Sequence, residues 1–146
     1  MYVLDTNMMS TLGWEDSPKA MRIQKRLSGL REDEFATTII SFEEFTRGWL
    51  AVLARSKKLK EQIETYRRLG RQLHLFCCTK LLDFDEHAAI ELKRLKKQHP
   101  RLGSMDLKIA AITLSHHGIL VTANLRDFRQ IDGLAIEDWT RLDDRQ

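Results

Sequence analysis

The stretch Ser104-Met-Asp-Leu-Lys-Ile-Ala-Ala-Ile-Thr-Leu-Ser-His-His-Gly118-Ile-Leu-Val-Thr122 decides the fold class. Ser104 is suited to cap a helix that runs over residues 105–117, and Gly118 is suited to end that helix at the C′ position. Residues 119–122 form an apolar, β-branched run, which is typical of a strand buried on both faces. A helix that leads directly into a buried strand predicts an α/β fold.

Apolar segments and amphipathic segments alternate along the rest of the chain. Strands are predicted at residues 2–4, 35–40, 76–78 and 134–136, and helices at residues 8–12, 18–30, 41–53, 59–73, 85–98 and 126–130. In the helix over residues 59–73, one face carries apolar side chains and the other carries basic residues; the apolar residues are Ile63, Tyr66, Leu69 and Leu73. The alternation predicts a three-layer α/β/α sandwich with a mostly parallel central sheet, built as a single domain over residues 1–146.

Composition limits the class of protein. The 146 residues are 42% hydrophobic and 31% charged, with two prolines and seven glycines, which excludes a disordered or low-complexity chain. No apolar run approaches the roughly 20 residues of a membrane span, so we expect a soluble, cytoplasmic protein without membrane contact. Cys77 and Cys78 are neighbours, a spacing that fits neither a disulfide framework nor a zinc half-site, and they are interpreted as small hydrophobic residues in a strand.

The net charge of +3 conceals two regions of opposite charge. Residues 47–101 hold fourteen Lys and Arg against six Asp and Glu, whereas the remainder of the chain holds ten against fifteen. A basic block with acidic flanks is compatible with solvated helix faces. It is equally compatible with a surface for a polyanion beside a carboxylate-rich metal site.

Four carboxylates from separate segments are expected at one edge of the sheet. Ligands of open parallel sheets bind at the carboxyl ends of the strands. Asp5 directly follows the first strand, and Glu44 lies one turn into the helix after the second. Asp127 follows the strand at residues 119–122, and Asp106 opens the helix that leads into that strand. Since that helix and strand run antiparallel, Asp106 reaches the same edge.

Each acid also has a structural interpretation. Four local patterns could explain the acids one by one: a capping box of Ser41 and Glu44, a first-turn position of Asp106 after Ser104, a first-turn position of Asp127 after Asn124, and a turn of Asp5 with Thr6 and Asn7. None of these patterns explains why all four acids gather at the ligand edge. Oxygen-only ligands favour Mg²⁺ or Mn²⁺ over zinc, and such ions stabilise charge on a phosphate and activate water. Phosphodiester hydrolysis is therefore the chemistry that the acids suggest.

Four blocks of sequence carry these acids. They are Met1-Tyr-Val-Leu-Asp5-Thr-Asn7, Thr37-Thr-Ile-Ile-Ser41-Phe-Glu-Glu44-Phe-Thr-Arg-Gly48, Asp106-Leu-Lys-Ile-Ala-Ala-Ile, and Leu120-Val-Thr122-Ala-Asn124-Leu-Arg-Asp127-Phe128, followed by Gly133 and Trp139. In order and spacing, over residues 2–139, they resemble the PIN-domain ribonucleases, and in particular the VapC toxins of toxin–antitoxin pairs.

The resemblance implies two sets of site residues in a PIN-like sandwich. The acids that hold Mg²⁺ or Mn²⁺ and carry catalysis are Asp5, Glu44, Asp106 and Asp127. The polar residues that orient the acids are Asn7, Thr122 and Asn124. Asn124 and Asp127 share or divide the role of the fourth acid in the site, because some relatives place an acid where Asn124 stands. Gly48 lies one turn beyond Glu44, where a missing side chain leaves room for a substrate.

The implied function is that of a toxin, a metal-dependent endoribonuclease that hydrolyses structured RNA such as tRNA. The resemblance also implies a homodimer and neutralisation by a cognate VapB-like antitoxin. Apolar candidates for the antitoxin groove are Met8, Met9, Leu12, Trp49 and Leu53, with ordinary core as the alternative. Two rival functions stay open: a housekeeping PIN-domain nuclease for RNA processing without an antitoxin, and a catalytically silent PIN module that binds RNA or protein.

Overall fold

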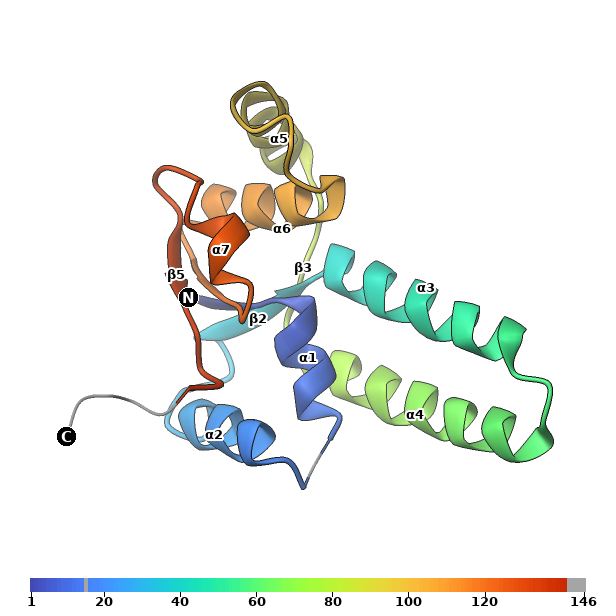
Figure 1. Cartoon of the computed structure of the whole chain (residues 1–146). Coiled ribbons are helices and arrows are strands. Elements are labelled where there is room, and N and C mark those ends of the chain that lie inside the picture. The colour runs from blue at the N-terminus through green and yellow to red at the C-terminus, as the bar shows by residue number, and fades with distance from the viewer. Residues whose placement is uncertain (15, 142–146) are drawn as a thin grey trace.

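The computed structural model describes residues 1–14 and 16–141 of the chain. Its centre is a five-stranded sheet in the order β3-β2-β1-β4-β5, in which all neighbouring strands are parallel (Figure 1). The strands are β1 (Tyr2–Leu4), β2 (Phe35–Thr38), β3 (Leu81–Leu82), β4 (Ile119–Val121) and β5 (Ala135–Glu137). The helices are α1 (Thr6–Leu12), α2 (Pro18–Leu27), α3 (Ile39–Arg55), α4 (Leu59–Cys77), α5 (Glu86–Gln98), α6 (Ser104–Ser115) and α7 (Leu125–Phe128).

Helices cover both faces of the sheet. Successive residues of a strand point to opposite faces. Val3 and Leu120 therefore belong to a core shared with α5 and α6, whereas Leu4 and Val121 belong to a second core shared with α1 and α2. All four side chains are fully buried. The α/β/α sandwich is thus confirmed, and the sheet is parallel throughout its described strands.

The apolar residues of α1 are part of the second core. Met8 and Met9 are fully buried and Leu12 is nearly so, packed in the same cluster as Leu4 and Val121. The interpretation of Met8, Met9 and Leu12 as the lining of a surface groove is therefore wrong, and the core alternative holds. Helix α1 begins directly after β1, and its apolar side chains pack on the sheet. It therefore lies close to the carboxyl edge of the sheet.

The boundary between β2 and α3 lies earlier than predicted. The strand ends at Thr38, whose hydroxyl accepts the backbone N–H of Ser41 at 3.0 Å and so caps a helix that begins at Ile39. Ser41 is fully buried within the first turn. The predicted capping box of Ser41 and Glu44 is therefore wrong, because Ser41 is not the N-cap residue.

Helix α4 is longer than predicted, and its apolar stripe is not the face that packs on the core. It continues to Cys77, so the predicted strand at residues 76–78 is wrong, and the third strand is Leu81–Leu82 instead. Phe76 extends the helical spacing and its ring lies 5.3 Å from that of Phe42, edge to face. Cys77 and Cys78 are exposed thiols at the end of the helix rather than small hydrophobic residues in a strand.

The inward side chains of α4 are Thr65, Gln72 and Phe76. Ile63, Tyr66 and Leu73, which share the apolar face of this helix, are each more than half exposed. The apolar stripe does not lie against the sheet, because α3 and α4 form a hairpin that extends away from it (Figure 1). An apolar stripe on such a hairpin has no sheet to cover.

Helix α6 begins and ends differently from the prediction. Gly103 is the N-cap residue and Ser104 already lies in the helix. The left-handed residue after the helix is His117, with φ of 51°, and not Gly118. A Cβ atom at Gly118 would lie 3.0 Å from Cγ2 of Val3 and 3.2 Å from the carbonyl oxygen of Met1, so close packing against the N-terminal segment favours glycine there.

Other boundaries differ by a few residues. Helix α2 ends at Leu27 instead of residue 30, while Ser17 caps it as predicted by accepting the N–H of Ala20 at 3.0 Å. Helix α1 begins at Thr6 rather than at Met8. None of the helices in the described part of the chain is long and apolar enough to cross a membrane.

Candidate active site

The four predicted acids lie on four different elements at the carboxyl edge of the sheet. Asp5 follows β1 and is the N-cap residue of α1, and Glu44 lies in α3, which continues directly from β2. Asp106 lies in the first turn of α6, and Asp127 lies in α7, which follows β4. The parallel order of β2, β1 and β4 places the ends of these strands side by side, so the topology brings the acids together.

Asp5 lies at the centre of the site and is 4% exposed. Its Oδ1 atom accepts the backbone N–H of Thr6 at 2.7 Å. Its Oδ2 atom accepts the hydroxyl of Thr122 at 2.7 Å and the side-chain amide of Asn7 at 2.9 Å. Three donors from two strand ends therefore fix the carboxyl group. The predicted turn of Asp5 with Thr6 and Asn7 is present. Its hydrogen bonds hold the Asp5 carboxyl group in place within the cluster of acids.

The carboxyl groups influence one another electrostatically. Burial raises the pKa of Asp5 to about 6, and the charges of Asp106 and Glu44 add to the rise, against hydrogen bonds from Thr122 and Thr6 that lower it. Burial also raises the pKa of half-buried Asp106, with further contributions from Glu44 and Asp127. The raised values show that the site disfavours several negative charges unless a cation accompanies them.

Glu44 is held by a residue that sequence reasoning missed. The hydroxyl of Thr6 donates a hydrogen bond to Oε1 of Glu44 at 2.7 Å. Neighbouring Glu43 instead forms a surface ion pair with Arg47, one turn along the same helix. The structure thus separates two adjacent glutamates, one turned toward α1 and one toward solvent. The sequence offered one signal for this role, because Thr6 directly follows Asp5 and carries a hydroxyl group.

Asn124 and Asp127 are joined to each other and to Asp5. The side-chain amide of Asn124 donates to Oδ2 of Asp127 at 3.0 Å, and no cap hydrogen bond is made by the Asn124 side chain. The backbone N–H of Asn124 donates to the hydroxyl of Thr122 at 3.0 Å, and that hydroxyl donates to Asp5. Asn7 joins the same network, since its amide lies 3.3 Å from the Thr122 hydroxyl. Each of the three predicted orienting residues therefore donates a hydrogen bond to an acid, Asn7 and Thr122 to Asp5 and Asn124 to Asp127.

The chemistry of this donor set fits a hard divalent cation. It consists of carboxylate oxygens, the ligands that Mg²⁺ and Mn²⁺ prefer, and the buried Asp5 and half-buried Asp106 both have raised pKa values that a cation would lower. Among residues 1–14 and 16–141, no three His, Cys, Asp or Glu side chains already close around a common point as a complete ligand set. The acids are close enough for their charges to shift the pKa values of Asp5 and Asp106, but their side chains do not form such a ligand set within the described ranges.

Comparison with known proteins agrees with this geometry. Residues 2–134 match the PIN domain family. The chain is similar to Ribonuclease VapC1 of Haemophilus influenzae (strain R2866), with 28% identity over 142 residues that cover 97% of this chain and 99% of that protein. It is also similar to the tRNA(fMet)-specific endonuclease VapC of Salmonella typhimurium, with 38% identity over 63 residues, 40% of this chain and 48% of that protein.

Solved structures show the same fold. The DNA-bound VapBC from Salmonella typhimurium superposes with a TM-score of 0.76 at 27% identity, covering 94% of this chain and 97% of that chain. VapBC-1 from nontypeable Haemophilus influenzae superposes with a TM-score of 0.74 at 26% identity, covering 96% and 98%. Because the sequence match spans most of the chain and the fold agrees, the chain belongs to the PIN domain family.

Proposed function

We propose that this chain is a metal-dependent endoribonuclease of the VapC type, the toxin of a toxin–antitoxin pair. Its substrate is a structured RNA such as a tRNA. The observation that carries the proposal is the buried Asp5 carboxyl, whose pKa the charges of Asp106 and Glu44 help to raise at the carboxyl edge of the sheet. Similarity to a VapC ribonuclease along almost the whole chain supports RNA as the substrate class.

Asp5, Glu44, Asp106 and Asp127 are the residues that would hold Mg²⁺ or Mn²⁺. When bound, the cation supplies charge neutralisation at the scissile phosphate and acidifies the attacking water. The basic block over residues 47–101 adds positive potential that attracts RNA to the protein as a whole.

The protein residues orient the acids and receive a proton. Thr122 and Asn7 hold the Asp5 carboxyl in one orientation, and Thr6 does the same for Glu44. The buried Asp5 oxygens already accept three hydrogen bonds, whereas the Asp106 carboxyl is only half-buried and is open to solvent. We therefore assign Asp106 as the better acceptor for the proton that leaves the attacking water.

Substitution of Asp5 tests the proposal. Purified wild-type protein with Mg²⁺ or Mn²⁺ should cleave tRNA, and Asp5→Asn should reduce the rate by about a hundredfold or more, because the metal contributes several kcal/mol to catalysis. Glu44→Gln should behave in the same way. Glu43→Gln is the matched control, since Glu43 pairs with Arg47 at the surface, and its activity should equal that of the wild type.

The rival functions make different forecasts in the same experiment. A catalytically silent binding module predicts no metal-dependent cleavage by the wild type, or cleavage that persists unchanged in Asp5→Asn with its fold retained by circular dichroism. A housekeeping nuclease predicts cleavage without growth arrest on expression. Growth arrest that depends on Asp5 would exclude both rivals.

An antitoxin partner and a homodimer are part of the proposal. The solved VapBC structures similar to this chain support a partner protein. The hairpin offers it an apolar surface, where the exposed side chains Leu50, Tyr66 and Leu73 border a cavity of about 420 Å³ over Phe42 and Phe45. Co-expression with a small neighbouring gene should suppress growth arrest and yield a co-purifying complex, and light scattering on the free protein should give a dimer mass.

A further inference from the structure

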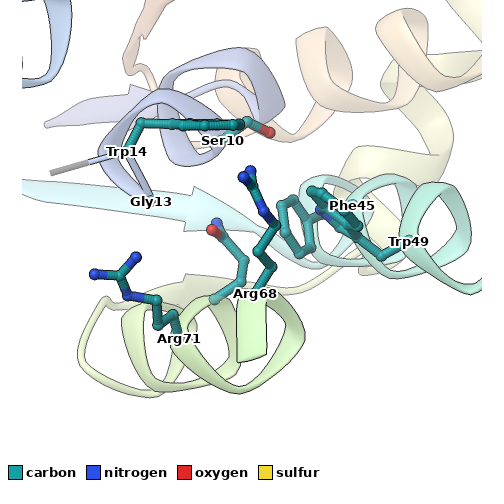
Figure 2. A pocket seen from close by; sticks show the side chains of 8 residues that line it. Ser10, Gly13, Trp14, Phe45, Trp49, Arg68 and Arg71 are labelled. Atoms are coloured by element: carbon teal, nitrogen blue, oxygen red, sulfur yellow. The ribbon is translucent and has the colours of Figure 1, made fainter. Parts of the chain in front are cut away.

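Arg68 lies between two tryptophans at the far end of α1 from Asp5. Its guanidinium carbon is 3.8 Å from the ring centre of Trp14 and 5.5 Å from that of Trp49. Trp14 follows α1, Trp49 lies in α3, and Arg68 rises from α4 toward both (Figure 2). Three segments distant in the sequence thus meet in one cationic and aromatic stack.

The stack belongs to a pocket with an unusual lining. Three aromatic rings and two arginines contribute to it, from Trp14, Phe45, Trp49, Arg68 and Arg71 (Figure 2). Among the described residues, no Asp or Glu lines this pocket. Aromatic faces together with cations are the features of a groove that takes nucleic-acid bases and phosphates.

Packing alone does not account for Trp14. The junction of α1 and α4 is already closed by Gln72, whose side-chain amide donates to the carbonyl oxygen of Met9 at 3.0 Å. The approach is so tight that a Cβ atom at Gly13 would lie 2.7 Å from Oε1 of Gln72. Trp14 is nevertheless 54% exposed, so a large part of its indole surface faces solvent beside Arg68.

The pocket and the acids share α1 and α3 as walls. Thr6, which holds Glu44, opens α1, and Ser10 of the pocket lies four residues later, about 6 Å along the helix axis. Phe45 of the pocket directly follows Glu44 in α3. An RNA strand with its scissile phosphate at the acids therefore has its neighbouring nucleotides within reach of the pocket.

We propose that this pocket is a nucleotide subsite for the RNA substrate. A base flanking the scissile phosphate stacks on the exposed face of Trp14, and Arg68 faces the phosphate that follows it. Trp14 and Arg68 are thus substrate-positioning residues, while the acids carry the chemistry. The inference rests on the proposed function, since it assumes that RNA lies across the acids.

Binding separates this inference from the proposed function. The full chain carrying Asp5→Asn would be titrated with a fluorescent single-stranded RNA of mixed sequence, and tryptophan quenching would be followed in parallel. Adding Trp14→Ala or Arg68→Gln should weaken binding by about 5- to 100-fold, as expected for the loss of one stacked base. Trp14→Phe, which keeps an aromatic face, should retain most of the affinity and also guards against a loss of fold.

Arg67→Gln is the matched control for Arg68→Gln. Both arginines pair with Glu64 from neighbouring positions of α4, but only Arg68 stacks on the indoles. Arg67→Gln should change RNA affinity by no more than about twofold, because it removes only one exposed charge at moderate salt.

Three results would overturn the inference. In an otherwise wild-type chain, Trp14→Ala and Arg68→Gln could cleave RNA with unchanged KM while Asp5→Asn is inactive, which refutes the subsite and leaves the proposed function intact. Equal losses of RNA affinity in Arg67→Gln and Arg68→Gln would mean that Arg68 contributes only nonspecific positive charge. Weakened binding of a purified antitoxin with unchanged RNA affinity would assign the pocket to a protein partner instead. Failure of the wild type to cleave RNA would refute the proposed function, while the binding titration would still decide whether the pocket binds RNA.

Discussion

Thr6 connects two acids of the candidate site: its hydroxyl donates to Oε1 of Glu44 at 2.7 Å, while its backbone N–H donates to Oδ1 of Asp5 at 2.7 Å. Thr6→Val keeps the shape and the backbone bond but removes the hydroxyl. We expect metal affinity and RNA cleavage to fall by about 10- to 100-fold, the usual effect of losing a residue that orients a metal ligand. Isothermal titration with Mn²⁺ measures the first and single-turnover cleavage the second.

Thr6→Ser is the control for that experiment, because it restores the hydroxyl with one methyl group fewer. Its Mn²⁺ affinity should lie close to that of the wild type. Equal affinities for the Val and Ser variants would mean that the bond to Glu44 has no part in ordering the site.

The contribution of Asp5 to the stability of the metal-free protein should fall as the pH rises from about 3.8 through about 6. The pKa of Asp5 is about 6 in the folded chain against an ordinary value of 3.8, so the folded state binds this proton more tightly than the unfolded state. The stabilisation is therefore fully present below about pH 3.8 and is lost as the pH rises through about 6. A shift of this size corresponds to about 3 kcal/mol in the free energy of unfolding, which urea denaturation across that pH range would measure.

Asp5→Asn removes the titrating group and should flatten this part of the pH profile. Mg²⁺ should raise the Tm of the wild type above pH 6, where the carboxyl groups are charged, and should leave the Tm of Asp5→Asn nearly unchanged. A profile with the same slope in both proteins would assign the pH dependence to other groups.

The arrangement of the acids was predictable because it follows from topology. Once the strands at residues 2–4, 35–38 and 119–121 are parallel neighbours, Asp5, Glu44 and the start of α6 must meet at one edge. Strand and helix signals were strong enough for that conclusion. Contacts between elements were not predictable, because a bond such as that from Thr6 to Glu44 depends on the angle between α1 and α3, which no local pattern encodes.

The hairpin of α3 and α4 shows where periodicity fails. An apolar stripe predicts which residues share a helix face but not what lies opposite. In α4 the stripe of Ile63, Tyr66 and Leu73 faces solvent, while Thr65 and Gln72 face inward. Gln72 is tolerated inside because its amide binds the carbonyl oxygen of Met9, a partner 63 positions away in the sequence.

Gly48 offers a test of space beside the acids. A Cβ atom added there would meet no atom within 4 Å, and the same holds for Gly70 in α4. Both positions are helical, so Gly48→Ala and Gly70→Ala should each raise the free energy of unfolding by up to about 1 kcal/mol. Only Gly48→Ala should raise the KM for RNA, since Gly48 lies one turn beyond Glu44. Equal KM values in the two variants would mean that substrate does not use this space.

Asn124 and Asp127 should act as a unit, because the amide of Asn124 donates to Oδ2 of Asp127 at 3.0 Å. Asp127→Asn removes a charge from the cluster, and Asn124→Ala leaves the Asp127 carboxylate without this partner. We expect each single substitution to lower the rate of metal-dependent cleavage. The double variant should be only slightly slower than Asp127→Asn, since orienting a carboxylate matters only while the carboxylate is present. A double-mutant cycle on the cleavage rate measures the coupling; strictly additive losses would instead indicate that Asn124 contributes on its own account, as an independent ligand or substrate contact.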